Sequence, residues 1–94
     1  MTQQYLVGEL SARLEQLQSV TTSDTALEVA CLRYQIEEGP LSGLVPAARR
    51  ALMLADGLCW ESLSRGDVVA FASQATLAGD LRLFGISAQL VGDD

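Results

Sequence analysis

Three residue types that carry much of protein chemistry are missing from this chain, which contains no His, no Lys and no Asn. Without His there is no Ser-His-Asp triad, no Cys-His dyad and no imidazole metal ligand. Without Lys there is no Schiff-base chemistry and no phosphate-loop lysine. Carboxylate-bridged di-iron bundles are excluded as well, because they use Glu-x-x-His motifs on facing helices. The sequence therefore predicts no catalytic residue, no cofactor and no bound metal.

Cysteine is also scarce, and the two thiols, Cys31 and Cys59, are too few for the disulfide framework of a small secreted domain. Two cysteines on different helices do not make a zinc site. We interpret both as small core hydrophobes. The N-terminal segment lacks the basic start and apolar core of a signal peptide, and no apolar run approaches the roughly 18–20 residues of a membrane span. We expect a soluble, cytoplasmic protein with free thiols.

Positive charge is limited to six Arg residues against twelve acidic ones, which gives a net charge of −6. Only Arg49 and Arg50 are adjacent, so there is no basic stripe that could release counterions from nucleic acid. The acidic balance also opposes binding to anionic membranes. Arg without Lys, together with abundant Ala, Gly, Leu and Val, is typical of a GC-rich bacterial genome. We expect neither a nucleic acid nor a membrane as partner.

Apolar residues are plentiful: 49% of the 94 residues are hydrophobic, and the mean hydropathy is +0.23. This length predicts a single domain over residues 1–94. A chain of this size buries only about 60–65% of the surface that its unfolded form exposes. The surplus of apolar side chains must therefore enter a buried helix, a partner interface or a ligand cavity.

The apolar residues recur with helical spacing and show no β-strand alternation. We expect helices over about 2–19, 24–38 and 67–84, and a third helix that ends at 64 and begins at either 41 or 46. Pro46 fits best in the first turn of that helix. The short connections predict an all-α fold, an antiparallel bundle of four main helices with room for a short fifth over 86–91.

Turn and cap residues separate these helices. Ser23 or Asp24 is expected to cap the second helix, which Gly39 ends in a left-handed conformation. Asp67 is expected to cap the fourth helix after a tight turn, and Gly85 to stop it. We expect the last two helices to pair as a hairpin. The small-residue faces that would meet are Leu44, Ala48, Ala51, Leu52, Ala55, Leu58 and Cys59 on one and Val68, Phe71, Ala72, Ala75 and Gly79 on the other.

Three further apolar stripes are more than one thin bundle needs. Large exposed apolar patches mark binding sites, and Trp and Met are enriched at interfaces. The sequence therefore predicts a non-catalytic interaction or assembly module that binds itself as a homodimer or binds another protein. The predicted interface residues are Val29, Leu32, Ile36, Met53, Trp60, Leu77, Leu81 and Phe84.

Three alternatives stay open. A bundle that binds a small apolar ligand would hold a cavity between its helices. The tripeptide Glu61, Ser62 and Leu63 resembles the Asp-Ser-Leu motif of acyl carrier proteins, whose serine is modified at a helix start; here Ser62 falls late in a helix. A small enzyme would need charged groups that converge in a cleft. The residues available for that are Glu9, Arg13, Arg33, Arg49 and Arg50, whereas Glu37, Glu38 and Asp56 are expected to be solvated.

Overall fold

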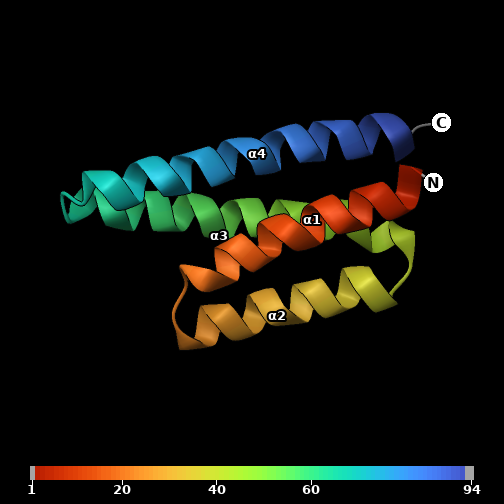
Figure 1. Ribbon diagram of the computed structural model, residues 1–94, viewed down its shortest axis with the longest axis horizontal. Helices are drawn as coiled ribbons and strands as arrows, with labels where there is room; N and C mark the ends of the chain where they lie inside the picture. Colours follow the sequence, from red (N-terminus) through yellow and green to blue (C-terminus); the bar gives the residue numbers. More distant parts are fainter. Residues whose placement is uncertain (1, 93–94) are drawn as a thin grey trace.

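The computed structural model describes residues 2–92, with side chains at 5–22, 24–40 and 42–85. Four helices and one short 3₁₀ turn make up this part of the chain (Figure 1). It contains no β-strand. The elements are α1 (Thr2–Ser19), α2 (Ser23–Glu38), η1 (Leu41–Gly43), α3 (Leu44–Ser64) and α4 (Val68–Gly92). The all-α prediction is confirmed.

The helices are arranged as two pairs of sequence neighbours, α1 with α2 and α3 with α4 (Figure 1). In the view of Figure 1, α1 crosses in front of α3 and lies between α2 and α4. The molecule is elongated, with extents of 43 × 24 × 16 Å. At the end away from both termini, the α3/α4 pair reaches beyond α1 and α2. This projecting end is formed by the turn between α3 and α4.

The core is built around α1. Its residues Leu10, Leu14 and Leu17 have no exposed surface, because the spacing of three and four residues places them on one side of the helix. The other helices contribute one buried face each, which on α3 consists mainly of alanines. These faces are Val29, Leu32 and Ile36 on α2, Leu44, Ala47, Ala48, Ala51 and Ala55 on α3, and Leu77, Ala78, Leu81 and Phe84 on α4.

On α2 the predicted N-cap is wrong, and Gly39 ends the helix as predicted but in a different conformation. The N-cap is Thr22, in an extended conformation and without a side-chain cap hydrogen bond, whereas Ser23 is already the first helical residue. At the other end Gly39 is extended, with φ −97° and ψ −178°, and not left-handed. Its N–H still donates to the carbonyl of Gln35 at 2.9 Å, so the chain leaves the helix towards Pro40 without a positive φ.

The turn between α3 and α4 forms as predicted. Gly66 has a φ of +73°, a conformation that favours glycine. Asp67 Oδ1 accepts a hydrogen bond from the N–H of Ala70 at 3.1 Å, which satisfies one free donor at the start of α4. At the start of α3, η1 precedes Leu44, so Pro46 lies in the first turn, where its missing N–H is tolerated.

The predicted end of the fourth helix is wrong, because α4 continues without a break through Gly85 to Gly92. A glycine costs a helix only about 1 kcal/mol relative to alanine. Phe84, next to Gly85, is 8% exposed in the core, and this packing outweighs the weak local propensity. The segment 86–91 is therefore the continuation of α4 and no separate fifth helix.

The face of α4 that packs inward is also not the predicted one. The structure buries Gln74, Leu77, Ala78 and Leu81, whereas Val68 is 71% exposed. Ala72 is exposed too, and Phe71, Ala75 and Gly79 are half-buried. Leu77 and Leu81 take inward positions in preference to Ala72 and Gly79, because burying leucine removes more apolar surface from water than burying alanine or glycine does.

Candidate interaction surface

The structure divides the eight predicted interface residues into two groups. Six of them lie in the core of one chain, with 0–8% exposure. The prediction that their stripes are surplus is wrong, because the leucine face of α1 packs against the inward faces of the other three helices. These six are Val29, Leu32, Ile36, Leu77, Leu81 and Phe84. The remaining two, Met53 and Trp60, are 64% and 69% exposed.

Met53 and Trp60 lie on the side of α3 that is turned away from the core. They are seven residues apart, which is two helical turns, and Gly57 lies between them on the same side. Gly57 has open space where a side chain would be. Charged residues flank this stripe and are exposed as well. We call the whole set the α3 outer face: Arg49, Arg50, Met53, Gly57, Trp60 and Glu61.

A groove between α3 and α4 runs beside the α3 outer face. It has two hollows, and Arg82 lines both of them. The guanidinium of Arg82 lies 3.0 Å from each carboxylate oxygen of Asp56. The first hollow, about 320 Å³, is lined by Asp56, Cys59, Trp60, Leu63, Phe71, Ala75, Ala78 and Arg82. The second, about 350 Å³, is lined by Val45, Ala48, Arg49, Leu52, Leu81, Arg82 and Gly85.

Several exposed apolar residues were missed by the sequence reasoning. Leu63, Val68 and Val69 are 50–83% exposed around the projecting end of the α3/α4 pair. On α2, Leu27 and Tyr34 are 66% and 69% exposed. The signal for the α2 residues was present, because Leu27 and Tyr34 lie on the side of the helix opposite the buried stripe. Periodicity alone does not say which of two opposite stripes faces inward.

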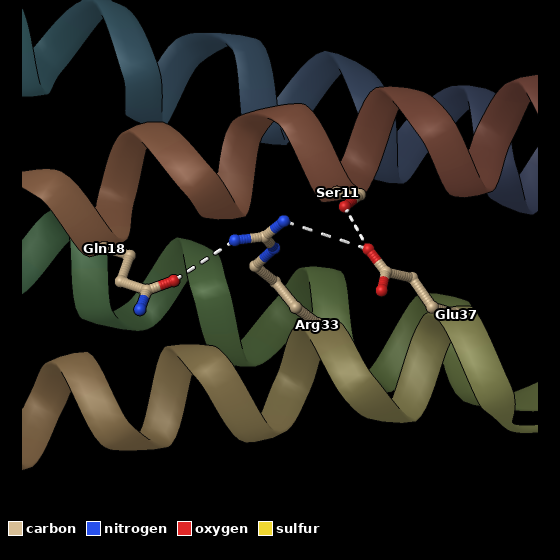
Figure 2. A network of polar contacts seen from close by, with 4 residues as sticks. All are labelled: Ser11, Gln18, Arg33 and Glu37. Carbon is tan, nitrogen blue, oxygen red and sulfur yellow. Dashed lines mark hydrogen bonds and ion pairs between the residues drawn. The ribbon is translucent and has the colours of Figure 1, made fainter.

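Most arginines are held by partners within the chain, as in the polar network between α1 and α2 (Figure 2). Arg33 Nη1 donates to Gln18 Oε1 at 3.3 Å, and its Nη2 lies 4.0 Å from Glu37 Oε1. Ser11 Oγ donates to the same Glu37 oxygen at 2.6 Å. Arg33 Nε is buried and has no hydrogen-bond partner among the side chains that the structure describes. The network links α1 to α2 along one edge.

Of the other ion pairs, one lies within α1 and the rest link different helices. Arg13 lies 3.6 Å from Glu9, as the spacing of four residues predicts, and 3.7 Å from Asp80 on α4. Arg50 of α3 donates twice to the carboxylate of Glu28 on α2. This hydrogen bond to Arg50 holds the pKa of Glu28 below its ordinary value.

The five residues considered for an enzyme do not converge on one site. Arg13 and Glu9 pair on α1, Arg33 serves the α1–α2 edge, and Arg50 serves the α2–α3 edge. Arg49 makes no ion pair with any described side chain. Glu9 and Arg13 line a hollow of about 230 Å³ between α1 and α4 together with Asp80, whereas Arg33, Arg49 and Arg50 lie away from it.

Ser62, the residue that carries the resemblance to acyl carrier proteins, is fully buried in α3. The Gln74 amide nitrogen, in the orientation that satisfies its neighbours, donates to Ser62 Oγ at 2.6 Å and faces the carbonyl oxygens of Leu58 and Ala70 at 3.0 and 3.3 Å. Arg65 Nη2 also donates to Ser62 Oγ, at 3.4 Å. A buried hydroxyl cannot receive a prosthetic arm in this conformation, so the resemblance does not extend to the modification site.

The two thiols lie in different surroundings, and both are free. Cys59 packs partly buried against the core, as predicted. Burial, and then the nearby Asp56, raise the pKa of its thiol above the ordinary value. The prediction for Cys31 is wrong, because this thiol is exposed. Cys31 lies on the outer side of α2 between Leu27 and Tyr34.

Within the described residues, no group of three or more His, Cys, Asp or Glu side chains is placed to hold a metal ion. No described helix combines the length and apolar character needed to cross a membrane. Comparisons of the chain with protein-family models, with curated proteins and with solved structures found no match.

Proposed function

We propose that this protein is a non-catalytic interaction module of the cytoplasm, an antiparallel bundle of four helices that binds a protein through the α3 outer face. The observation that carries the proposal is the exposure of Met53 and Trp60, at 64% and 69%, on one side of a helix whose other side forms the core. Trp and Met are enriched in interfaces, and a Trp near the centre of a contact is a frequent source of binding energy.

The position of α3 supports this role. Its buried residues contact the core along most of the helix, from Leu44 to Ser62. Arg50 ties it to α2, and Asp56 ties it to α4. A helix fixed on three sides has little backbone freedom left to lose, which lowers the entropic cost of binding.

The hollows of the structure favour a protein partner over a small apolar ligand. A ligand pocket normally buries most of its ligand in an enclosed, mainly apolar site. The first hollow of the α3/α4 groove is lined by Trp60 and Leu63, which are 69% and 50% exposed, and is bordered by the Asp56–Arg82 ion pair. Such a shallow groove suits a helix better than a molecule that needs enclosure.

The test compares two aromatic residues of equal exposure. Trp60 and Tyr34 are both 69% exposed, one on α3 and the other on α2. We expect Trp60→Ala to abolish the association of the protein, whether with itself in light scattering or with a partner captured from its native lysate. Tyr34→Ala should leave that association unchanged. The proposal fails if the wild-type protein neither self-associates nor binds a partner, or if both variants behave alike.

A further inference from the structure

We infer that the occupant of the α3 outer face is a second copy of this chain, with the two α3 helices packed antiparallel about a two-fold axis at the level of Ala55. This inference rests on the proposed function and specifies its partner. It draws on three features of the α3 outer face: the positions of its large and small residues, the distribution of its charges and its place in a strongly acidic protein.

The positions of Met53 and Gly57 are self-complementary. Met53 lies two residues before Ala55 and Gly57 two residues after it. In an antiparallel pair centred at this level, Met53 of each copy therefore meets Gly57 of the other. Met53 is 64% exposed, and there is open space at Gly57 where a side chain would stand. The flexible thioether fits into the gap that the glycine leaves, and the helices can approach closely.

The charges of the face are self-complementary in the same arrangement. Arg49 and Arg50 lie in the first half of α3, and Glu61 lies in the second half. All three are exposed. Antiparallel packing brings Arg49 of one copy opposite Trp60 of the other on one flank, where a guanidinium can stack on the indole. On the other flank, Arg50, which also holds Glu28 of its own chain, comes opposite Glu61 of the second copy and can be shared between the two carboxylates. Parallel packing would place arginine against arginine.

The net charge of −6 makes this face the favourable place for two copies to meet. Two acidic chains repel each other, and the repulsion is smallest where each presents cations, here Arg49 and the Arg50 that neutralises Glu28. By contrast, the exposed apolar residues of α2 lie on a helix that has exposed acids at both ends, Asp24 at the first and Glu37 and Glu38 at the second. Antiparallel pairing of α2 would bring Asp24 towards these glutamates. A two-fold contact through α3 also closes the assembly at a dimer.

The first test changes the same charge at two places. Glu61→Arg places a cation opposite Arg50 of the second copy, whereas Glu38→Arg makes an equal charge change on α2, away from the contact. Sedimentation equilibrium in reducing buffer should show a wild-type dimer and a dissociation constant raised at least about tenfold by Glu61→Arg, which corresponds to 1.4 kcal/mol. Glu38→Arg should dimerise as well as the wild type or better. Equal effects of the two variants would contradict the inference.

The second test fixes the register. In chains whose native cysteines are replaced (Cys31→Ser, Cys59→Ala), Met53→Cys and Gly57→Cys are introduced separately, and the two variants are mixed under oxidising conditions. The heterologous pair should form a disulfide-linked dimer faster than either variant alone, because only residues 53 and 57 lie opposite each other. Met53→Cys mixed with Tyr34→Cys is the matched control and should not cross-link above background. Cross-linking in the control, or none in the first mixture, would overturn this register.

The outcomes separate this inference from the proposed function. A wild-type protein that stays monomeric in sedimentation, yet loses a lysate partner on Trp60→Ala, overturns the self-association and leaves the proposed function standing. A protein that neither self-associates nor binds a partner overturns both the inference and the proposed function.

Discussion

The α1/α2 pair and helix α3 bury different kinds of side chain. The α1/α2 pair contributes large aliphatic residues, among them Leu10, Leu14 and Leu17 with no exposed surface. The buried face of α3 consists mainly of alanines, such as Ala48, Ala51 and Ala55. Leucines fill space between helices, whereas alanines let helices approach closely. Similar helical patterns therefore serve two purposes. The leucine face of α1 fills the core, whereas the alanine face brings α3 close to its neighbours and leaves its outer face exposed.

The pairs also differ in how polar groups join their helices. The α1–α2 edge carries the partly exposed network around Arg33 (Figure 2). The α3/α4 pair carries the exposed Asp56–Arg82 ion pair and, towards the projecting end, the buried contact of Ser62 with Gln74. Substitution at the buried contact should lower the stability more than substitution at the exposed ion pair, because an unsatisfied polar group is most unfavourable where water cannot replace its partner.

The largest effect is expected from a substitution in the leucine face of α1, which tests whether this helix supplies the core. Leu14→Ala removes a fully buried side chain and should lower the free energy of unfolding by about 2–5 kcal/mol, because a cavity remains. Met53→Ala on the α3 outer face should change it by less than about 0.5 kcal/mol at concentrations where the protein is monomeric. Urea denaturation followed by circular dichroism measures both. Equal losses would remove the distinction between the two helices.

Overpacking tests the small-residue face of α3. Ala51→Leu inserts a larger side chain where Ala51 has no exposed surface, and it should destabilise the protein by about 1–3 kcal/mol. Ala12→Leu is the matched control, because Ala12 is exposed on α1. Thermal denaturation of both variants would decide. If Ala51→Leu is as stable as Ala12→Leu, the α3 face has spare room and close packing is not its role.

A double-mutant cycle tests the buried polar contact. Ser62→Ala removes one acceptor of the Gln74 amide, and Gln74→Leu removes the amide itself. Each single substitution should lower the free energy of unfolding by about 1–3 kcal/mol, because the remaining polar side chain loses a hydrogen-bond partner. The double variant should lose less than the sum of the two. Strictly additive losses would show that the two side chains do not act together.

The smallest expected effect concerns the exposed pair of Glu28 with Arg50. Because the pKa of Glu28 is lowered in the folded protein, its contribution to stability is present above the unfolded value and disappears as the pH falls through the folded value. Glu28→Gln should remove this part of the acid sensitivity and leave the stability at neutral pH nearly unchanged, since exposed ion pairs contribute little. The pH dependence is measured from the urea unfolding midpoints of the wild type and the variant between neutral and acidic pH. The idea fails if both proteins show the same pH profile.

The thiols give a further comparison of the two pairs. Cys31 is exposed on α2, whereas burial raises the pKa of Cys59 on α3. At neutral pH, an alkylating reagent should modify Cys31 several-fold faster than Cys59, because the thiolate is the reactive form. Peptide mapping by mass spectrometry after a short reaction gives the two rates. Faster modification of Cys59 would show that the α3/α4 groove opens in solution.

Much of the fold could be predicted from helical spacing and local stop signals. The bounds of α1 and the cap at Asp67 follow from short-range patterns and agree with the structure. The inward faces of α2 and α4 were harder, because each helix carries two apolar stripes. Leu27 and Val29 are equally plausible core residues in isolation, and only the position of the other helices decides between them. The continuation of α4 through Gly85 likewise depends on tertiary packing that outweighs local propensity.

The candidate site was predictable only in part for the same reason. Met53 and Trp60 were identified correctly as exposed, because they alternate with charged residues on α3. The other six predicted interface residues were identified only as apolar, and the structure uses them for its own core.

The most direct test of the account uses Trp60, which is the only tryptophan of the chain. Trp60 is 69% exposed in the single chain. Acrylamide quenching of its fluorescence therefore measures whether another protein covers its indole. We expect strong quenching below micromolar concentration and clearly weaker quenching, with an emission maximum shifted to the blue, at tens of micromolar. Quenching that is equally strong at both concentrations would contradict the second copy on the α3 outer face.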